Sequence, residues 1–193
     1  MNLILASQSP RRQQLLEQIG LKFTVQVADI DETMDPSKPP EEQVAEVSAR
    51  KAAAIRARVG NDDVIIAADT IVVVDSTILG KPHSEEEAKA MLRRLSGRSH
   101  RVMTGVTVQK GDEVCSYTEI TAIRFRKLTE NEICAYAASG DPMDKAGSYG
   151  IQNAAAVFVE GMDGDYFNVM GLPLCSLTCV LRRFGVAVLG EKG

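Results

Sequence analysis

Short apolar runs and stretches of helical periodicity alternate along the whole chain. Apolar runs cover residues 3–5, 23–27 and, almost without interruption, 64–74. Residues 41–58 instead have the periodicity of an amphipathic helix, with acidic residues first, basic residues later and Gly60 beyond the end. Because strands and helices alternate, the pattern predicts an α/β fold.

The second half of the chain continues this alternation. Residues 84–87 (SEEE) and 129–132 (TENE) have the form of capping boxes, and they predict helices that end near Gly97 and Gly140. Between and after these helices we expect two hairpin strands, at 100–109 and 114–127, that turn at 111–112. A glycine-rich polar loop at 141–153, a strand at 154–160 and a last amphipathic helix at 172–184 complete the pattern.

The first predicted helix begins in a way that suits phosphate binding. Ser9 is a good N-cap and Pro10 a good first helical residue, and the unpaired N–H groups of a helix N-terminus attract anions. The hydroxyl groups of Ser7 and Ser9 and the guanidinium groups of Arg11 and Arg12 lie at this end. Positive charge in the first turn opposes the helix dipole, and a bound phosphate would remove that cost. A capped helix with solvated arginines explains the segment equally well.

The composition is that of a globular protein with a small excess of negative charge. The chain has 193 residues, of which 45% are hydrophobic, and this predicts a single domain, with room for two lobes and a sizeable core. The net charge is −4, Trp is absent and only 5% of residues are aromatic. These values argue against a nucleic-acid-binding protein, which would need a basic face or aromatic stacking platforms.

The cysteines, the histidines and the lack of targeting patterns narrow the class of protein further. There are four cysteines, none in a Cys-x-x-Cys pair, and two histidines, which argues against a structural zinc site. Cys175 and Cys179 lie four residues apart on a predicted helix, and we expect buried thiols there. The N-terminus has no signal-peptide pattern and no apolar run is long enough to cross a bilayer, so we expect a cytoplasmic protein.

Asp69 and Thr70 interrupt the apolar run at 64–74. Strands with so continuous an apolar sequence are usually covered on both faces, so a carboxylate within one must be paired, bind a metal or face a cleft. Held in that way, Asp69 could act as a general base. The alternative is that Asp69 caps a bulge or strand end while Thr70 bonds to the backbone.

Two further segments carry candidate ligand-binding groups. Lys81 is restricted by a glycine and a proline on either side and could return towards Asp69 across a hairpin, although a solvated lysine is the alternative. In the loop at 140–152, Lys145 and the Gln152 amide could reach a ligand. An amide both donates and accepts hydrogen bonds, as recognition of a nucleobase edge requires. An ordered loop with a purely structural role fits this segment as well.

Taken together, these segments resemble the successive motifs of the Maf family. The resemblance covers nearly the whole chain, with the motifs in the family's order. The matching segments are residues 6–12 (ASQSPRR), 68–70 (ADT), 79–82 (LGKP), 104–105 (TG), 144–152 (DKAGSYGIQ) and 168–173 (NVMGLP).

The resemblance implies a Maf/ITPase-like fold, a long twisted mixed β-sheet flanked by helices, with the site in a cleft between two lobes. It also implies a nucleoside triphosphate pyrophosphatase, a nucleotide diphosphatase among the hydrolases of acid anhydrides, which cleaves between the α- and β-phosphates. Residues 149–152 (YGIQ) resemble the branch that acts on dTTP and UTP, although Asn153 stands where that branch usually has Gly. A divalent cation, Mg²⁺ or Mn²⁺, is expected, with unknown protein ligands, and a homodimer is a family expectation.

The resemblance also marks the residues of the site. Asp69 is the proton acceptor that orients and deprotonates the attacking water, and Lys51 and Lys81 neutralise charge on the phosphoryl oxygens. Glu32 is a candidate for positioning the metal or the water, or else a solvated loop acid. The residues expected to bind the substrate or to determine its choice are Ser7, Ser9, Arg11, Arg12, Glu32, Thr70, Lys145 and Gln152.

Two other functions stay open at this stage. One is the same chemistry on 7-methyl-GTP, the preference of the sister branch. The other is a nucleotide-binding regulator of cell division without turnover. Pyrophosphate release from a panel of nucleotides separates all three.

Overall fold

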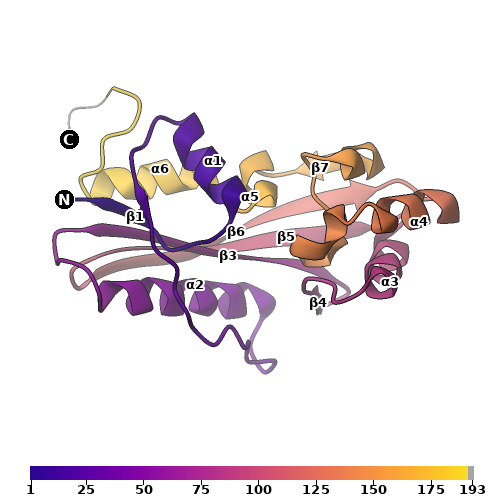
Figure 1. Cartoon of the computed structure of the whole chain (residues 1–193), viewed down its shortest axis with the longest axis horizontal. Helices are drawn as coiled ribbons and strands as arrows, with labels where there is room; N and C mark the ends of the chain where they lie inside the picture. Colours follow the sequence, from indigo (N-terminus) through magenta and orange to yellow (C-terminus); the bar gives the residue numbers. More distant parts are fainter. Residues whose placement is uncertain (191–193) are drawn as a thin grey trace. The chain divides into compact units, whose positions relative to one another are not determined.

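Seven strands form one mixed β-sheet in the computed structural model, which describes residues 1–190 (Figure 1). The strand order is β2-β1-β3-β5-β6-β7, and β4 pairs with β3 outside this path. β1 is parallel to both β2 and β3, whereas the β3–β4 and β6–β7 pairs are antiparallel. The strands are β1 (Leu3–Leu5), β2 (Thr24–Val25), β3 (Val64–Val74), β4 (Thr77–Leu79), β5 (Ser99–Lys110), β6 (Glu113–Phe125) and β7 (Val159–Asp163).

Helices flank these strands, so the predicted mixed α/β architecture is confirmed. Within residues 1–190 none of them combines the length and apolar character that a bilayer crossing requires. The α-helices are α1 (Pro10–Gln18), α2 (Pro40–Arg56), α3 (Glu85–Leu95), α4 (Glu130–Ala138), α5 (Tyr166–Met170) and α6 (Leu174–Arg183). Three short 3₁₀-helices follow α4, namely η1 (Asp141–Asp144), η2 (Ala146–Ser148) and η3 (Ala154–Phe158).

The chain divides into two compact units. Unit 1 comprises Met1–Asp69, Thr104–Glu119 and the chain from Gly171 onward, and unit 2 comprises Thr70–Met103 and Ile120–Met170. The single domain expected from the chain length stays a prediction, as does the cleft.

In unit 1, α2 packs on the neighbouring strands β1 and β3. Figure 1 shows α2 along one side of these strands and α1 and α6 along the other. The residues buried between α2 and the strands are all small or branched apolar side chains: Ile4, Ala6, Ala52, Ile55, Ile65 and Ala67. This packing holds α2 against β3.

Gly105 brings β5 unusually close to α2 in the same unit. A Cβ atom at this position would lie 2.3 Å from the carbonyl oxygen of Val44, which is closer than any side chain tolerates. Next to this contact, the hydroxyls of Ser48 on α2 and Thr107 on β5 are 2.7 Å apart and buried. The glycine of the 104–105 motif therefore has a packing role.

Unit 2 has its own core beneath α3 and α4, which pack against each other. Four aromatic rings, those of His100, Phe125, Tyr149 and Phe158, form a chain of edge contacts with centroids 4.7–5.9 Å apart. The His100 Nε2 atom lies 2.7 Å from the Tyr149 hydroxyl, and Nδ1 of the same ring is buried without a partner among the described residues. Burial lowers the pKa of His100 to about 4, so the ring is neutral near pH 7.

Most helix ends agree with the sequence analysis. Thr129 and Glu132 form the predicted capping box at the start of α4. At α3, Ser84 accepts the Glu87 N–H as expected, but the Glu87 carboxylate accepts the N–H of His83, so the box is only half formed. The glycines predicted to end α3 and α4, Gly97 and Gly140, adopt positive φ, and so does Gly20 after α1.

The strand predicted at 154–160 is wrong. Residues Ala154–Phe158 form η3, and β7 begins only at Val159. Val159 pairs with Phe125, the last residue of β6, so the residues before Val159 lie beyond the end of their partner strand. The expected loop at 141–153 likewise contains η1 and η2, and α5 was not predicted.

The buried thiols predicted at Cys175 and Cys179 are also wrong, because both side chains are exposed. Helix α6 buries Leu174, Leu177 and Leu181, and this spacing places the two cysteines on another face. The four-residue separation of the two cysteines fits the helix, but it does not determine which face of the helix is covered.

Candidate functional site

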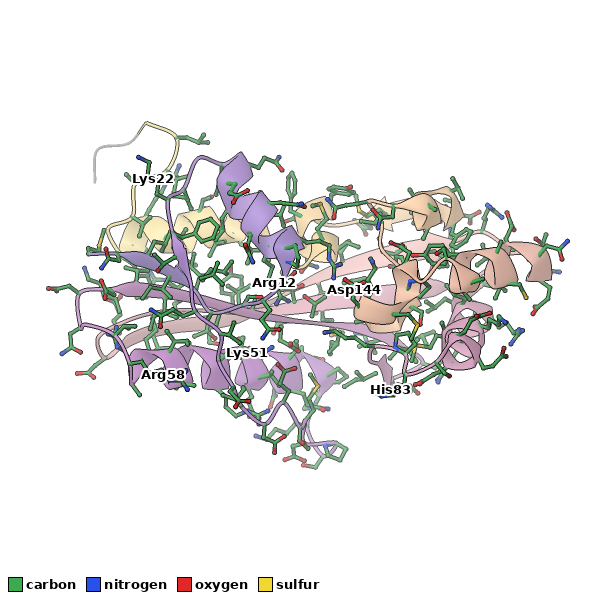
Figure 2. The ribbon with its side chains drawn as sticks, in the orientation of Figure 1. Arg12, Lys22, Lys51, Arg58, His83 and Asp144 are labelled. Carbon is green, nitrogen blue, oxygen red and sulfur yellow. The ribbon has the colours of Figure 1, made fainter. Side chains whose placement is uncertain are left out.

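A lysine and an aspartate meet where α2 lies on β3. The Nζ atom of Lys51 lies 2.7 Å from Oδ1 of Asp69, and the two side chains are only 10% and 15% exposed. Lys51 lies in the second half of α2, and Asp69 follows the apolar first part of β3. Figure 2 marks Lys51 on α2. The interrupted apolar run thus carries a paired carboxylate, as one of the sequence interpretations required.

Glu32 contributes a second carboxylate to the same ammonium group. Its Oε1 atom is 3.0 Å from Nζ of Lys51, although the Glu32 side chain is 58% exposed. One lysine therefore holds two carboxylates that come from a loop and a strand. Because the two negative charges exceed the one positive charge, this group of Lys51, Asp69 and Glu32, which we call the carboxylate–lysine triad, carries a net charge of −1.

The loop that carries Glu32 is held by its backbone. Arg50 donates to the carbonyl oxygens of Asp31 and Thr33, at 2.6 and 2.7 Å, and so grips the chain on both sides of Glu32. The Asp31 carboxylate in turn accepts the N–H and the hydroxyl of Thr33 in an Asx turn. The Asp31 pKa is lowered chiefly by the Thr33 side-chain hydrogen bond.

Typical free energies show why the loop needs the hydrogen bonds from Arg50. An ion pair with one largely exposed partner, such as Lys51–Glu32, contributes on the order of 1 kcal/mol or less. Ordering the backbone of a single residue costs about 1–2 kcal/mol. The ion pair alone is therefore too weak to order the loop, and the hydrogen bonds from Arg50 and the Asx turn supply the difference.

Arg12 lies buried at the start of α1, where Figure 2 labels it. Its Nε donates to the carbonyl oxygen of Gly171 at 2.7 Å, and its Nη1 donates to the hydroxyl oxygen of Ser7 at 3.1 Å. Ser7 also accepts the N–H of Ser9. Ser9 occupies the predicted N-cap position, but its side chain makes no capping bond. Arg12 and Ser7 thus form a fixed polar pair at this helix end.

The charges of unit 1 act on one another. Burial lowers the pKa of Arg12, the negative charges of Asp69 and Glu32 oppose this shift, and the positive charge of Arg11 adds to it. The two carboxylates of the carboxylate–lysine triad therefore act on the pKa of Arg12. Arg11, the next residue along α1, is partly exposed.

In unit 2, the predicted Lys81 is an exposed residue just after β4. The backbone before it is anchored, because Gly80 accepts a hydrogen bond from the N–H of Gly147 at 3.0 Å. Thr70, on β3, is partly exposed. Lys81 thus keeps a solvent-exposed ammonium on an anchored segment.

Lys145, expected from the sequence to reach a ligand, makes hydrogen bonds within its own loop. It is only 7% exposed, and its Nζ lies 2.7 Å from Oδ1 of Asp144 and 2.6 Å from the carbonyl oxygen of Asp141. The aliphatic part of the side chain covers Gly150, where a Cβ would meet it at 2.6 Å. Lys145 therefore braces the loop from within.

Asp141 collects the hydrogen bonds that shape the loop around Lys145. Its carboxylate accepts from the Tyr136 hydroxyl, from Lys145 Nζ and from the Asn153 side-chain amide. The Tyr136 hydroxyl also accepts the N–H of Gly150. Burial is the first cause of the raised pKa of Tyr136, with the hydrogen bond to Asp141 second.

Gln152 lies exposed in the turn that these contacts hold, immediately before Asn153. The left-handed backbone that Gly at position 153 would favour is not used, since Asn153 has a φ of −105°. Its side chain instead adds the hydrogen bond to Asp141. The departure from the usual glycine thus costs no backbone strain.

Sequence reasoning missed Arg50 and Asp141 as organising residues. Arg50 stands beside Lys51 on α2, but nothing in the local sequence shows that it reaches back 17–19 residues to the Glu32 loop. Asp141 follows a helix-ending glycine, where an acidic residue has many ordinary roles. Both functions depend on contacts that form only in the fold.

The structure therefore brings together Lys51, Asp69 and Glu32, and separately Ser7 with Arg12. It holds Lys145 within its own loop and leaves Lys81 and Gln152 exposed. No three His, Cys, Asp or Glu side chains among the described residues gather as a metal-binding group.

Known proteins resemble this chain in sequence over nearly its whole length. The family model described as "Maf-like protein" matches residues 2–184. A dTTP/UTP pyrophosphatase of Symbiobacterium thermophilum is 48% identical over 96% of this chain and 95% of its own length. A dTTP/UTP pyrophosphatase of a Geobacillus species is 49% identical over 95% and 98%. Among solved structures, a nucleoside-triphosphatase / dITP/XTP pyrophosphatase from Mycobacterium abscessus aligns with 99% of this chain and 100% of its own, at 13% identity and a TM-score of 0.45.

Proposed function

This chain belongs to the Maf family, and from that premise we propose that it hydrolyses dTTP and UTP to the nucleoside monophosphate and pyrophosphate. Support comes from curated relatives named dTTP/UTP pyrophosphatase, which are 48% and 49% identical over nearly the whole chain. Hydrolase chemistry is common to these relatives. The cleaved bond in the proposal is the anhydride between the α- and β-phosphates.

The chemical step is an in-line displacement by water. The water oxygen bonds to the α-phosphorus, the bond from that phosphorus to the bridging oxygen breaks, and pyrophosphate leaves with the electron pair. Asp69 accepts the proton of the water. Lys51 contacts Oδ1 of Asp69, which leaves Oδ2 to take this proton. The lysine also keeps the carboxylate in one orientation.

Lys51 and the start of α1 balance the charge of the phosphates. Arg12 is held by Ser7 and Gly171, so its guanidinium needs little reordering when an anion arrives. In the proposal Ser7, Ser9, Arg11 and the helix N-terminus bind the phosphate chain with it. Preorganised contacts of this kind are each worth roughly 3–4 kcal/mol in the transition state.

The unit 2 residues are assigned to the phosphoryl oxygens and the base. The exposed Lys81 neutralises phosphoryl charge. Thr70 and the Gln152 amide bond to the O4, N3 or O2 edge of a pyrimidine. Lys145 acts on the substrate through the loop it braces, since its ammonium is already held by Asp141 and Asp144.

A divalent cation, Mg²⁺ or Mn²⁺, belongs to the proposal. Glu32 and Asp69 supply hard carboxylate oxygens beside a single lysine, and Mg²⁺ at phosphate sites is typically bound by one or two carboxylates plus the substrate phosphates. The donor set therefore fits a cation that arrives with the nucleotide. When bound, such a cation screens the charge on the leaving pyrophosphate. A cytoplasmic location and a homodimer are further parts of the proposal.

The observation that carries the proposal is the contact of Lys51 with both Asp69 and Glu32 on a Maf-family chain. The test measures pyrophosphate release from dTTP, UTP, CTP, ATP, GTP and 7-methyl-GTP, with and without Mg²⁺ or Mn²⁺. Asp69→Asn is compared with Asp62→Asn, a matched change at an exposed loop residue seven positions earlier.

We expect metal-dependent turnover of dTTP and UTP that is lost in Asp69→Asn and kept in Asp62→Asn, with nucleotide binding retained in both. Turnover confined to 7-methyl-GTP would overturn the substrate assignment and keep the chemistry. Binding without release from any nucleotide would overturn the enzyme assignment in favour of a regulatory binder.

A further inference from the structure

Arg50 makes two hydrogen bonds with the loop that carries Glu32, and the proposed chemistry gives it no role. Residues 29–39 lie outside helices and strands, and Glu32 is largely exposed within them. The Glu32 carboxylate nevertheless reaches Lys51 at 3.0 Å. Something other than apolar burial must hold this segment in place.

Arg50 and Lys51 are consecutive residues of α2 that act on the same loop in different ways. Lys51 contacts the Glu32 side chain, whereas Arg50 contacts the backbone before and after it, through Nη1 to Asp31 and Nη2 to Thr33. Two carbonyl oxygens from residues on either side of Glu32 are thus bridged by one guanidinium. A lysine carries the same charge but lacks the planar fork of N–H donors with which Arg50 reaches the two carbonyl oxygens through separate nitrogens.

We propose that Arg50 is a positioning residue, which holds the backbone on both sides of Glu32 and so presents the Glu32 carboxylate to Lys51 and Asp69. This inference rests on the proposed function, because it assigns to Arg50 an effect on the same hydrolytic site. Arg50 touches no reacting atom in this role. Its whole contribution passes through Glu32.

The test compares Arg50→Lys, Glu32→Gln and the double variant. The control is Arg58→Lys, a change of the same kind just beyond the end of α2, where Arg58 donates to a single carbonyl oxygen of another loop residue, Val27 (Figure 2). Pyrophosphate release from dTTP is measured at a series of MnCl₂ concentrations. Hydrogen exchange of the peptide spanning residues 29–39 is measured on the same proteins without nucleotide.

We expect Arg50→Lys to lower kcat about tenfold or more, with KM for dTTP within twofold of the parent. The double variant should equal Glu32→Gln within twofold, because Arg50 acts only through Glu32. The peptide at 29–39 should exchange faster in Arg50→Lys than in the parent or in Arg58→Lys. The MnCl₂ dependence should shift in the same direction in Arg50→Lys and Glu32→Gln.

Two results would overturn the inference. In the first, the effects of Arg50→Lys and Glu32→Gln multiply in the double variant, which would mean independent roles. In the second, exchange of the 29–39 peptide is unchanged in Arg50→Lys. If the parent protein itself releases no pyrophosphate, the proposed function fails, and the exchange measurement still decides whether Arg50 holds the loop.

Discussion

The Lys51 ammonium lies 2.7 Å from the Asp69 carboxylate, with both side chains nearly buried. Residue 51 belongs to a helix and residue 69 to the strand beneath it, so the pair joins two elements of unit 1. Glu32 adds a second, more exposed carboxylate to the same nitrogen. Loss of either partner alone would leave a nearly buried charge without its counter-charge and lower the free energy of unfolding. Single and double variants of the pair therefore test its effect on stability separately from its effect on activity.

The first prediction concerns removal of the lysine alone. Lys51→Met leaves the Asp69 carboxylate nearly buried without its partner, and we expect a loss of roughly 3 kcal/mol in the free energy of unfolding. The double variant Lys51→Met/Asp69→Asn removes both charges and should recover most of this loss. Urea unfolding measures both variants. Pyrophosphate release should fall at least about 100-fold in each. Equal stability of the single and double variants would contradict the prediction.

The second prediction concerns pH. The folded-state pKa of His100 is about 4, below its ordinary value of 6.5, because burial disfavours the charged ring. Between these values the unfolded chain binds a proton at this site and the folded protein does not. The free energy of unfolding should therefore fall as the pH is lowered from 6.5 to 4, by at most about 3 kcal/mol from this group.

Urea unfolding at pH 7, 6, 5 and 4.5 checks the pH prediction. His100→Gln removes the titrating ring and should flatten this part of the pH dependence. Tyr149→Phe is the matched control, since it removes the hydrogen bond to His100 but leaves the histidine buried. A slope that is unchanged in His100→Gln would assign the pH dependence to other groups.

The third prediction concerns the turn that carries Gln152. Asn153→Ala removes the side-chain hydrogen bond to Asp141 and should loosen this turn. Because the turn presents the amide assigned to base recognition, we expect the ratio of kcat/KM for dTTP over CTP to fall several-fold, with little change in stability. Asn61→Ala, at an exposed loop position of unit 1, is the control. An unchanged ratio would remove Asn153 from substrate selection.

The fourth prediction concerns Gly105. Its α-hydrogen faces the α2 backbone, and an added Cβ would lie 2.3 Å from the carbonyl oxygen of Val44. Backbone cannot yield as a flexible side chain does, so Gly105→Ala should cost about 1–3 kcal/mol of unfolding free energy. Gly80→Ala is the control, since no atom lies within 4 Å of a Cβ there. Thermal and urea unfolding of the two variants should differ accordingly.

The sequence was most informative where local physics decides the outcome. The apolar run at 64–74 predicted β3 with its observed bounds, and the Thr129 capping box predicted the start of α4. The interruption of that run singled out Asp69, because a carboxylate on a covered strand needs a partner. These signals depend on periodicity and on residues close in sequence.

Predictions failed where the answer depends on residues far apart in sequence. The alanine-rich segment at 154–158 is not a strand, because β6 ends at Phe125 and offers it no partner. Cys175 and Cys179 are exposed, because leucines on another face of α6 are the ones that pack. Strand pairing and the covered face of a helix are properties of the assembled sheet.

The sequence by itself determined the mixed α/β class, the family resemblance and the identity of Asp69 and Lys51 as candidate groups. Only the tertiary structure decided that one lysine holds both Asp69 and Glu32, that Arg50 grips the Glu32 loop, and that Lys145 is held within its own loop. Periodicity and caps depend on neighbours within a few residues. Ion pairs and loop contacts instead form between residues that only folding brings within a few ångströms.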